Sequence, residues 1–83
     1  MNAREEEQKD IPSPLLRAFA INLRRARKGA GLTQRALADR VGVTQQYVGR
    51  IECGVANTSL NTLGSLAEAL GVEATQLLSD IKK

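Results

Sequence analysis

Three side chains between residues 45 and 50 carry planar hydrogen-bonding groups. Gln45 and Gln46 are consecutive amides, and Arg50 stands one helical turn after Gln46. A glutamine amide can pair with adenine N6 and N7, and a guanidinium can bind guanine O6 and N7 or a phosphate. Each residue also has a plain alternative, because glutamine suits the first turn of a helix and a surface arginine needs no partner. The chemistry alone leaves these alternatives open.

The composition excludes several other kinds of site. The chain of 83 residues has no histidine, and its one cysteine, Cys53, cannot form an internal disulfide or a zinc site. No nucleophile–base pair or metal cluster stands out, so we expect neither an enzyme nor a cofactor. Cys53 itself is either a redox-sensitive thiol or a small residue at a helix end. Because no apolar run approaches the ~20 residues of a membrane span and no signal-peptide core follows the start, we expect a cytoplasmic protein.

The net charge of +3 is divided unevenly along the chain. Residues 1–12 carry two positive and four negative side chains, residues 13–50 carry eight positive and one negative, and residues 51–83 carry two positive and four negative. The three segments therefore contribute −2, +7 and −2. A basic half of this kind indicates either a polyanion-binding face or the solvated surface of ordinary helices.

Helix start and stop residues divide the chain into a tail and one small domain. Residues 1–12 are polar and lack periodicity, so we predict a flexible tail, followed by a domain at 13–83. Ser13 and Pro14 suit the start of the first helix. Apolar spacing predicts five helices, at about 14–28, 34–41, 45–52 or 53, 60–70, and 73 to 79 or 81. No segment alternates like a strand, so the predicted fold class is all-α.

The second and third predicted helices are separated only by Gly42-Val43-Thr44. A tight turn of this length that begins with glycine is typical of a helix-turn-helix, here at about residues 34–53. Ala38, Val41 and Val48 would pack the two helices into a corner. The second helix would then present its first side chains to a major groove about 12 Å wide. The alternative is a purely structural corner of two helices.

Short motifs follow one another in a fixed order along most of the chain. They are Leu23 and Arg27, Gly31-Leu32-Thr33-Gln34, Leu37-Ala38, Val41-Gly42-Val43-Thr44, Ile51-Glu52, Gly54, Ser59-Leu60, Thr62-Leu63, Leu66-Ala67 and Ala69-Leu70-Gly71-Val72. Together these motifs resemble the phage repressor and Cro-like proteins, also called the XRE family. The resemblance covers roughly residues 15–80, which is nearly everything outside the tail. It implies a compact five-helix, lambda-repressor-like DNA-binding domain.

The resemblance assigns base reading to the start of the helix at 45–52. It implies that Gln45, Gln46 and Arg50 face the bases, although a phosphate contact stays open for Arg50. Tyr47 has two interpretations, because its ring either contacts DNA or packs beside another helix. Gly49 is unusual inside a helix and indicates close approach either to DNA or to a neighbouring helix.

The resemblance also implies contacts that carry no sequence information. The implied phosphate contacts are Gln34, Arg35, Thr44, Asn57, Thr58 and Ser59. Gln34 is otherwise a solvated first-turn residue, and Arg24 and Arg40 are either further phosphate contacts or solvated charges. Arg27 and Glu52 match a pair that forms a structural salt bridge in the family, so neither is expected to read a base.

A homodimer is the implied assembly, because one such domain spans about one half-site of DNA. The last helix and the loop before residue 60 are the expected dimer surface. Leu77 and Leu78 cannot both face one small core, so we expect one of them, together with Ile81, to lie between subunits.

The implied function is a transcriptional regulator, either repressor or activator, that binds an inverted repeat in double-stranded DNA. Proteins of the same fold offer two alternatives, an antitoxin with a toxin partner for the tail at 1–10 and a restriction–modification controller. A protein-binding coactivator that does not read bases is the alternative from another class. It predicts that Gln45→Ala and Gln46→Ala leave the function intact.

Overall fold

The computed structural model describes residues 13–79. Within this range five helices follow one another, namely α2 (Pro14–Gly29), α3 (Gln34–Val41), α4 (Gln45–Glu52), α5 (Leu60–Leu70) and α6 (Ala74–Leu77). No strand occurs among residues 13–79, and the all-α prediction is confirmed. The tail predicted for residues 1–12 lies outside the described residues.

Hydroxyl side chains cap the starts of four helices. Each accepts a hydrogen bond from the backbone N–H three residues later, at 2.9 or 3.0 Å, and the four caps are Ser13, Thr33, Thr44 and Ser59. Gly42 and Gly71 end α3 and α5 in the left-handed region, with φ of 87° and 72°. These signals are local, which is why the predicted bounds of α3 and α5 agree with the observed ones.

The last helix is shorter than the sequence predicts. It spans only Ala74–Leu77, whereas the apolar spacing predicted a helix from 73 to 79. The side-chain amide of Asn22 on α2 donates to the carbonyl oxygens of Leu77 at 3.1 Å and of Ser79 at 2.8 Å. Because these bonds come from another helix, they hold the chain out of helical geometry after Leu77. The predicted extension to residue 81 lies outside the described residues.

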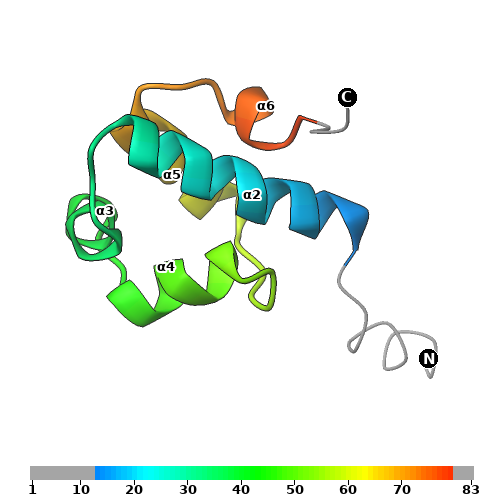
Figure 1. The fold of residues 1–83 in the computed structure, drawn as a ribbon, viewed down its shortest axis with the longest axis horizontal. Coiled ribbons are helices and arrows are strands. Elements are labelled where there is room, and N and C mark those ends of the chain that lie inside the picture. The colour runs from blue at the N-terminus through cyan, green and yellow to red at the C-terminus, as the bar shows by residue number, and fades with distance from the viewer. Residues whose placement is uncertain (1–12, 80–83) are drawn as a thin grey trace.

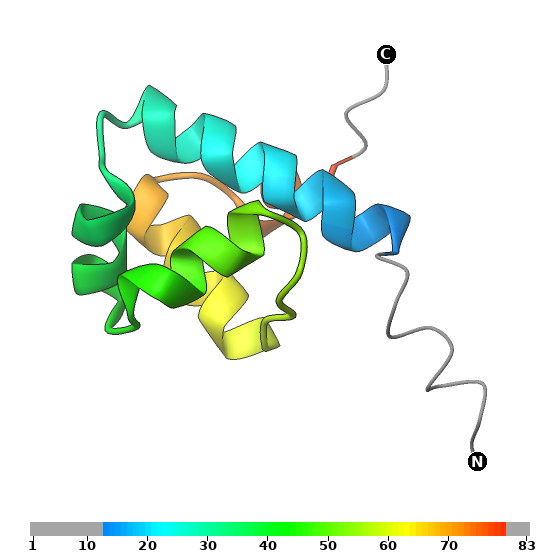
Figure 2. The ribbon, with the colours of Figure 1, turned by 60° about the horizontal axis from the view of Figure 1, so that its bottom comes forward.

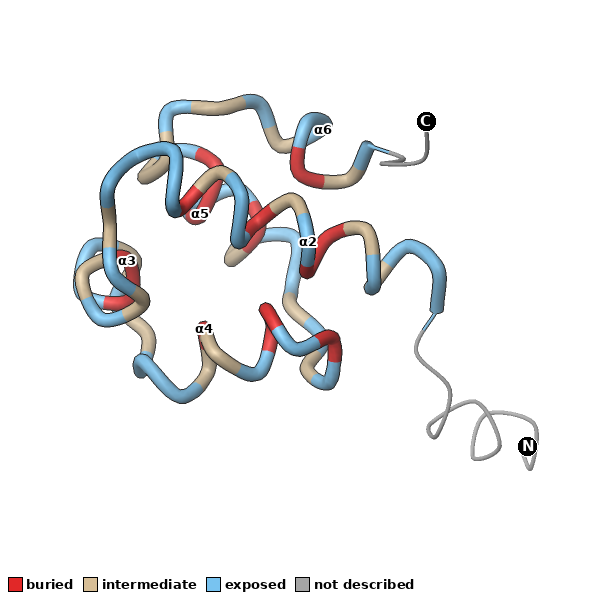
Figure 3. Tube along the Cα trace, in the orientation of Figure 1, coloured by how far each residue is buried: buried red, intermediate tan, exposed pale blue. Residues whose placement is uncertain are grey.

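The helices pack around a small core that is aliphatic except for Phe19. Figure 1 shows α2 between α4 on one side and α6 on the other, with α3 at one end. The buried core residues are Phe19, Leu23, Leu37, Ala38, Val48, Ile51, Leu63, Leu66, Ala67 and Leu77. Figure 3 shows these buried positions spread over every helix, so each helix contributes to the same core. Within the described residues, no helix has the length and apolar content that crossing a membrane requires.

Candidate nucleic-acid interface

Helices α3 and α4 meet in a tight corner. The turn begins at Gly42, and the N–H groups of Gly42 and Val43 both donate to the carbonyl oxygen of Ala38, at 2.8 and 3.0 Å. Ala38 and Val48 are buried on the two sides of the corner, and the half-buried Val41 and Val43 pack against the same core. The corner therefore holds α4 in one orientation, with its first turn at the edge of the molecule (Figure 2).

The outer side of α4 presents polar side chains to solvent. Gln45, Gln46 and Arg50 are exposed, whereas Val48 and Ile51 are completely buried. The structure thus brings the three predicted base-reading residues to the open side of the second helix of the corner. Their contact with bases stays a prediction.

A chain of hydrogen bonds joins the surface of α4 to the interior. Gln45 Nε2 donates to Gln34 Oε1 at 3.4 Å, and Gln34 Nε2 donates to Glu52 Oε1 at 3.1 Å. The sequence led us to expect either a phosphate contact or a solvated first-turn residue for Gln34. No local signal indicates this bridging role, because Gln34 lies 11 and 18 residues from its two partners.

The ion pair expected between Arg27 and Glu52 is present and buried. Arg27 Nε donates to Glu52 Oε2 at 2.7 Å, and Arg27 Nη2 donates to Glu52 Oε1 at 3.0 Å. The third nitrogen, Nη1, donates to the carbonyl oxygen of Leu32 at 2.8 Å. Arg24 is more loosely placed, with its Nε 3.9 Å from Glu52 Oε1 and its side chain 59% exposed. The pair ties α2 to the end of α4.

The environment of Glu52 keeps its carboxylate ionised. Burial by itself raises the pKa of Glu52, but the hydrogen bonds from Arg27 and Gln34 outweigh burial and hold that pKa below its ordinary value. The hydrogen bond to Glu52 raises the pKa of Arg27 in turn. Both groups are therefore charged at neutral pH, and Glu52 acts as a structural brace.

Tyr47 and Gly49 both face protein neighbours. The half-buried ring of Tyr47 packs against the core, and its hydroxyl donates to the carbonyl oxygen of Asn57 at 2.9 Å. This favours the packing interpretation of Tyr47. A Cβ atom built on Gly49 would lie 3.5 Å from Gln34 Oε1, which is an ordinary contact distance. Gly49 thus faces the side chain that begins α3.

The predicted phosphate contacts differ in what their side chains offer. Arg35, Thr44 and Asn57 are exposed. The hydroxyl of Ser59 already caps α5. The Oγ1 of Thr58 is buried without a hydrogen-bond partner in this structure, so its hydroxyl is not presented to solvent, and a phosphate contact by Thr58 stays a prediction.

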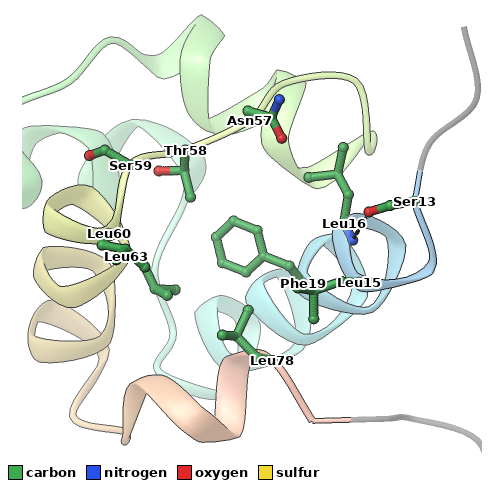
Figure 4. Close-up of a pocket in the computed structure, with 10 residues that line it drawn as sticks. All are labelled: Ser13, Leu15, Leu16, Phe19, Asn57, Thr58, Ser59, Leu60, Leu63 and Leu78. Carbon is green, nitrogen blue, oxygen red and sulfur yellow. Dashed lines mark hydrogen bonds between the residues drawn. The ribbon is translucent and has the colours of Figure 1, made fainter. Parts of the chain in front are cut away.

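The structure distinguishes the two leucines of which one was predicted to lie between subunits. Leu77 is 1% exposed and belongs to the core, so it is not available to a second subunit. Leu78 is half-buried and lines an apolar groove of about 170 Å³. Figure 4 shows this groove between the start of α2 and the start of α5, where Leu15 and Leu60 are 56% and 84% exposed. Ile81 lies outside the described residues.

Comparison with known proteins places this architecture in a family. The family model described as helix-turn-helix matches residues 23–77, from within α2 to the end of α6. The chain belongs to the helix-turn-helix family. A related helix-turn-helix protein, the uncharacterised HTH-type transcriptional regulator y4dJ of Sinorhizobium fredii, is 41% identical over 58 residues, which are 70% of this chain and 75% of that protein. The resemblance to the XRE family is thereby confirmed.

Solved structures of helix-turn-helix proteins share the fold. The hypothetical transcription factor NHTF from Neisseria superposes with a TM-score of 0.78 at 35% identity, covering 84% of this chain and 83% of that one. The restriction-modification controller protein C.AhdI from Aeromonas hydrophila superposes with a TM-score of 0.72 at 40% identity, covering 75% and 94%. The five-helix class predicted from the sequence is the class of these proteins.

Proposed function

We propose that this helix-turn-helix protein is a sequence-specific DNA-binding transcriptional regulator that inserts α4 into the major groove. One observation carries the proposal, namely the exposure of Gln45, Gln46 and Arg50 on the open side of an α4 that is fixed by the corner with α3. An α-helix fits the width of the major groove, and these side chains suit the edges of adenine and guanine. A DNA-binding regulator must share a compartment with the DNA, and the cytoplasmic location expected from the sequence agrees with this.

The hydrogen bond between Gln45 and Gln34 supports adenine reading. A glutamine amide has two N–H donors and one carbonyl oxygen, and Gln45 gives one donor to Gln34. One donor and one acceptor remain, and adenine N7 and N6 require one of each. Because Gln34 is itself held by Glu52, the amide of Gln45 is oriented before DNA arrives.

Phosphate contacts surround this reading surface in the proposal. The N-terminus of α3 carries unpaired backbone N–H groups, and the exposed Arg35 lies in its first turn. Gln34 retains one N–H after its bond to Glu52. The exposed Asn57 and the start of α5 form the second contact, on the other side of α4.

We further propose that the groove beside Leu78 holds a second copy of the chain. Among residues 13–79, four large apolar side chains are exposed, and two of them, Leu15 and Leu60, line this groove. In a two-fold interface, Leu60 of each copy would enter the groove of the other. A homodimer would then present two α4 helices to an inverted repeat.

Selection of bound sites from random DNA tests this function. We expect an enriched sequence with two-fold symmetry, whose half-sites lie about 34–36 Å apart, one turn of DNA, or a multiple of that distance. Enrichment of no sequence would contradict base reading and favour a coactivator that uses the fold to bind protein.

The similarity to C.AhdI favours a second, more specific candidate function. That protein is a restriction-modification controller, and this chain covers 94% of it at 40% identity. The second candidate function is therefore control of restriction–modification genes. The selected site would then lie in front of such genes, and a site in front of unrelated genes would contradict the assignment.

A further inference from the structure

The described part of the chain has far more exposed cations than acidic partners for them. Its only ion pairs join Arg24 and Arg27 to Glu52. Six other cationic side chains are exposed and have no acidic partner within ion-pair distance among residues 13–79, namely Arg17, Arg25, Lys28, Arg35, Arg40 and Arg50. This basic surface attracts DNA phosphates, and it also attracts any acidic chain segment that can reach it.

The chain itself contains an acidic segment, which precedes the described residues in the sequence. Residues 1–12 have a net charge of −2 and include the run Glu5-Glu6-Glu7, followed by Asp10. The segment joins the described domain at Ser13. Ser13 lines the same groove as Asn57, in the loop that follows α4 (Figure 4). The acidic segment is therefore attached beside the proposed DNA-binding side.

The length of the segment is sufficient to reach cations at that side. Glu6 and Glu7 are seven and six residues before Ser13, which allows at most about 20–25 Å at 3.3–3.6 Å per residue. The 16 residues of α2 span about 24 Å. Arg24 therefore lies within reach. So does the end of α4 with Arg50, because the Arg27–Glu52 pair holds that end against α2.

We propose that the acidic segment Glu5–Asp10 binds the basic surface around Arg24 and Arg50 and competes with DNA for it. This inference rests on the proposed DNA-binding function and adds its regulation. With an intramolecular competitor, the apparent affinity for all DNA equals the intrinsic affinity multiplied by the fraction of molecules in which the surface is open. Because its attraction weakens with salt, the competitor suppresses binding most at low ionic strength.

A pair of charge-matched double variants tests the competition. Glu6→Gln/Glu7→Gln removes two charges from the segment, and Glu68→Gln/Glu73→Gln removes two from exposed positions on α5 and before α6. The first variant should bind a random-sequence duplex roughly three- to fivefold more tightly, the equivalent of one or two exposed ion pairs. The gain should shrink between about 50 and 200 mM salt. The control should change by less than about twofold. Equal gains in both variants would show an effect of net charge alone and overturn the proposal.

A measurement without DNA separates this proposal from the proposed function. The arginine Nε–Hε signals of the wild-type chain are compared with those of Glu6→Gln/Glu7→Gln by NMR. We expect the signals of Arg24 and Arg50 to shift, and salt to move the wild-type signals in the same direction. Unchanged arginine signals would overturn the proposal. If the arginine signals shifted but the protein bound no DNA, the contact between the acidic segment and the basic surface would be supported. The proposed DNA-binding function would then be contradicted instead.

Discussion

At the scale of single residues, the contacts of Glu52 connect the interior to the proposed reading surface. Its carboxylate accepts hydrogen bonds from Arg27 on α2 and from Gln34 on α3, and Gln34 in turn accepts one from Gln45. A residue with no proposed DNA contact thus orients a residue that has one. Through such indirect contacts, a substitution in the interior of the domain can change the proposed recognition of DNA.

The variant Glu52→Gln should destabilise the domain in a pH-dependent way. Removing one partner of a buried ion pair costs about 3–5 kcal/mol, because Arg27 keeps its charge. The pKa of Glu52 is lowered from 4.5, so its stabilisation is complete above pH 4.5 and is lost as the pH falls through the lowered pKa. Urea unfolding of both proteins from pH 7 to acid should show a difference that shrinks below pH 4.5. A difference that stays constant in acid would contradict this account.

The variant Gly49→Ala should stabilise the domain. A methyl group at this position meets Gln34 Oε1 at 3.5 Å, which requires no rearrangement. Alanine is favoured over glycine inside a helix by about 1 kcal/mol, so the free energy of unfolding should rise by up to that amount. Thermal unfolding measures the change. Destabilisation would mean that the α3–α4 contact is tighter than the structure indicates.

At the scale of elements, local signals were enough to predict most helices, whereas the long-range contacts made by Asn22 and Gln34 were not predicted. The caps Thr33 and Thr44 and the stop at Gly42 lie within a few residues of the ends that they define. The end of α6 depends on Asn22, which is 55 residues away from Leu77. The bridging position of Gln34 depends in the same way on tertiary packing. The sequence therefore predicted the exposed face of α4, and the family resemblance predicted its Arg27–Glu52 ion pair, but neither indicated the hydrogen bonds through Gln34.

The turn between α3 and α4 should be sensitive to the left-handed backbone of Gly42. Its φ of 87° is unfavourable for a residue with Cβ, so Gly42→Ala should cost about 1–2 kcal/mol. Gly29→Ala is the matched control, because Gly29 is helical and a Cβ there meets nothing within 4 Å. The control should be neutral or stabilising in the same thermal unfolding experiment. If both variants changed the free energy of unfolding equally, the result would contradict a requirement for left-handed backbone at Gly42.

At the scale of the whole molecule, the exposed groove and the reading surface use different residues. The groove is lined by residues of α2, of the loop after α4 and of α5, together with Leu78, whereas Gln45 and Gln46 are not among its lining residues. The proposed dimerisation and the proposed base reading can therefore be altered separately. This separation is what a two-fold regulator requires.

The variant Leu60→Asp should abolish dimerisation without unfolding the domain. Leu60 is 84% exposed in the single chain, so its replacement removes almost no core contact. Analytical ultracentrifugation should show the wild type as a concentration-dependent dimer and the variant as a monomer, with unfolding of the monomer changed by less than about 0.5 kcal/mol. Ile21→Asp, at an exposed apolar position outside the groove, serves as the control and should remain dimeric. A dimeric Leu60→Asp would contradict the proposed interface.

The most direct test of the central claim compares the affinity of Gln45→Ala for the selected site and for a random duplex. If Gln45 reads a base edge, the variant should lose about 1–3 kcal/mol on the selected site and little on random DNA. Arg35→Ala, at a proposed phosphate contact, should weaken both complexes alike and lower the salt dependence by about one unit. An equal loss of Gln45→Ala on both duplexes would contradict base reading by α4.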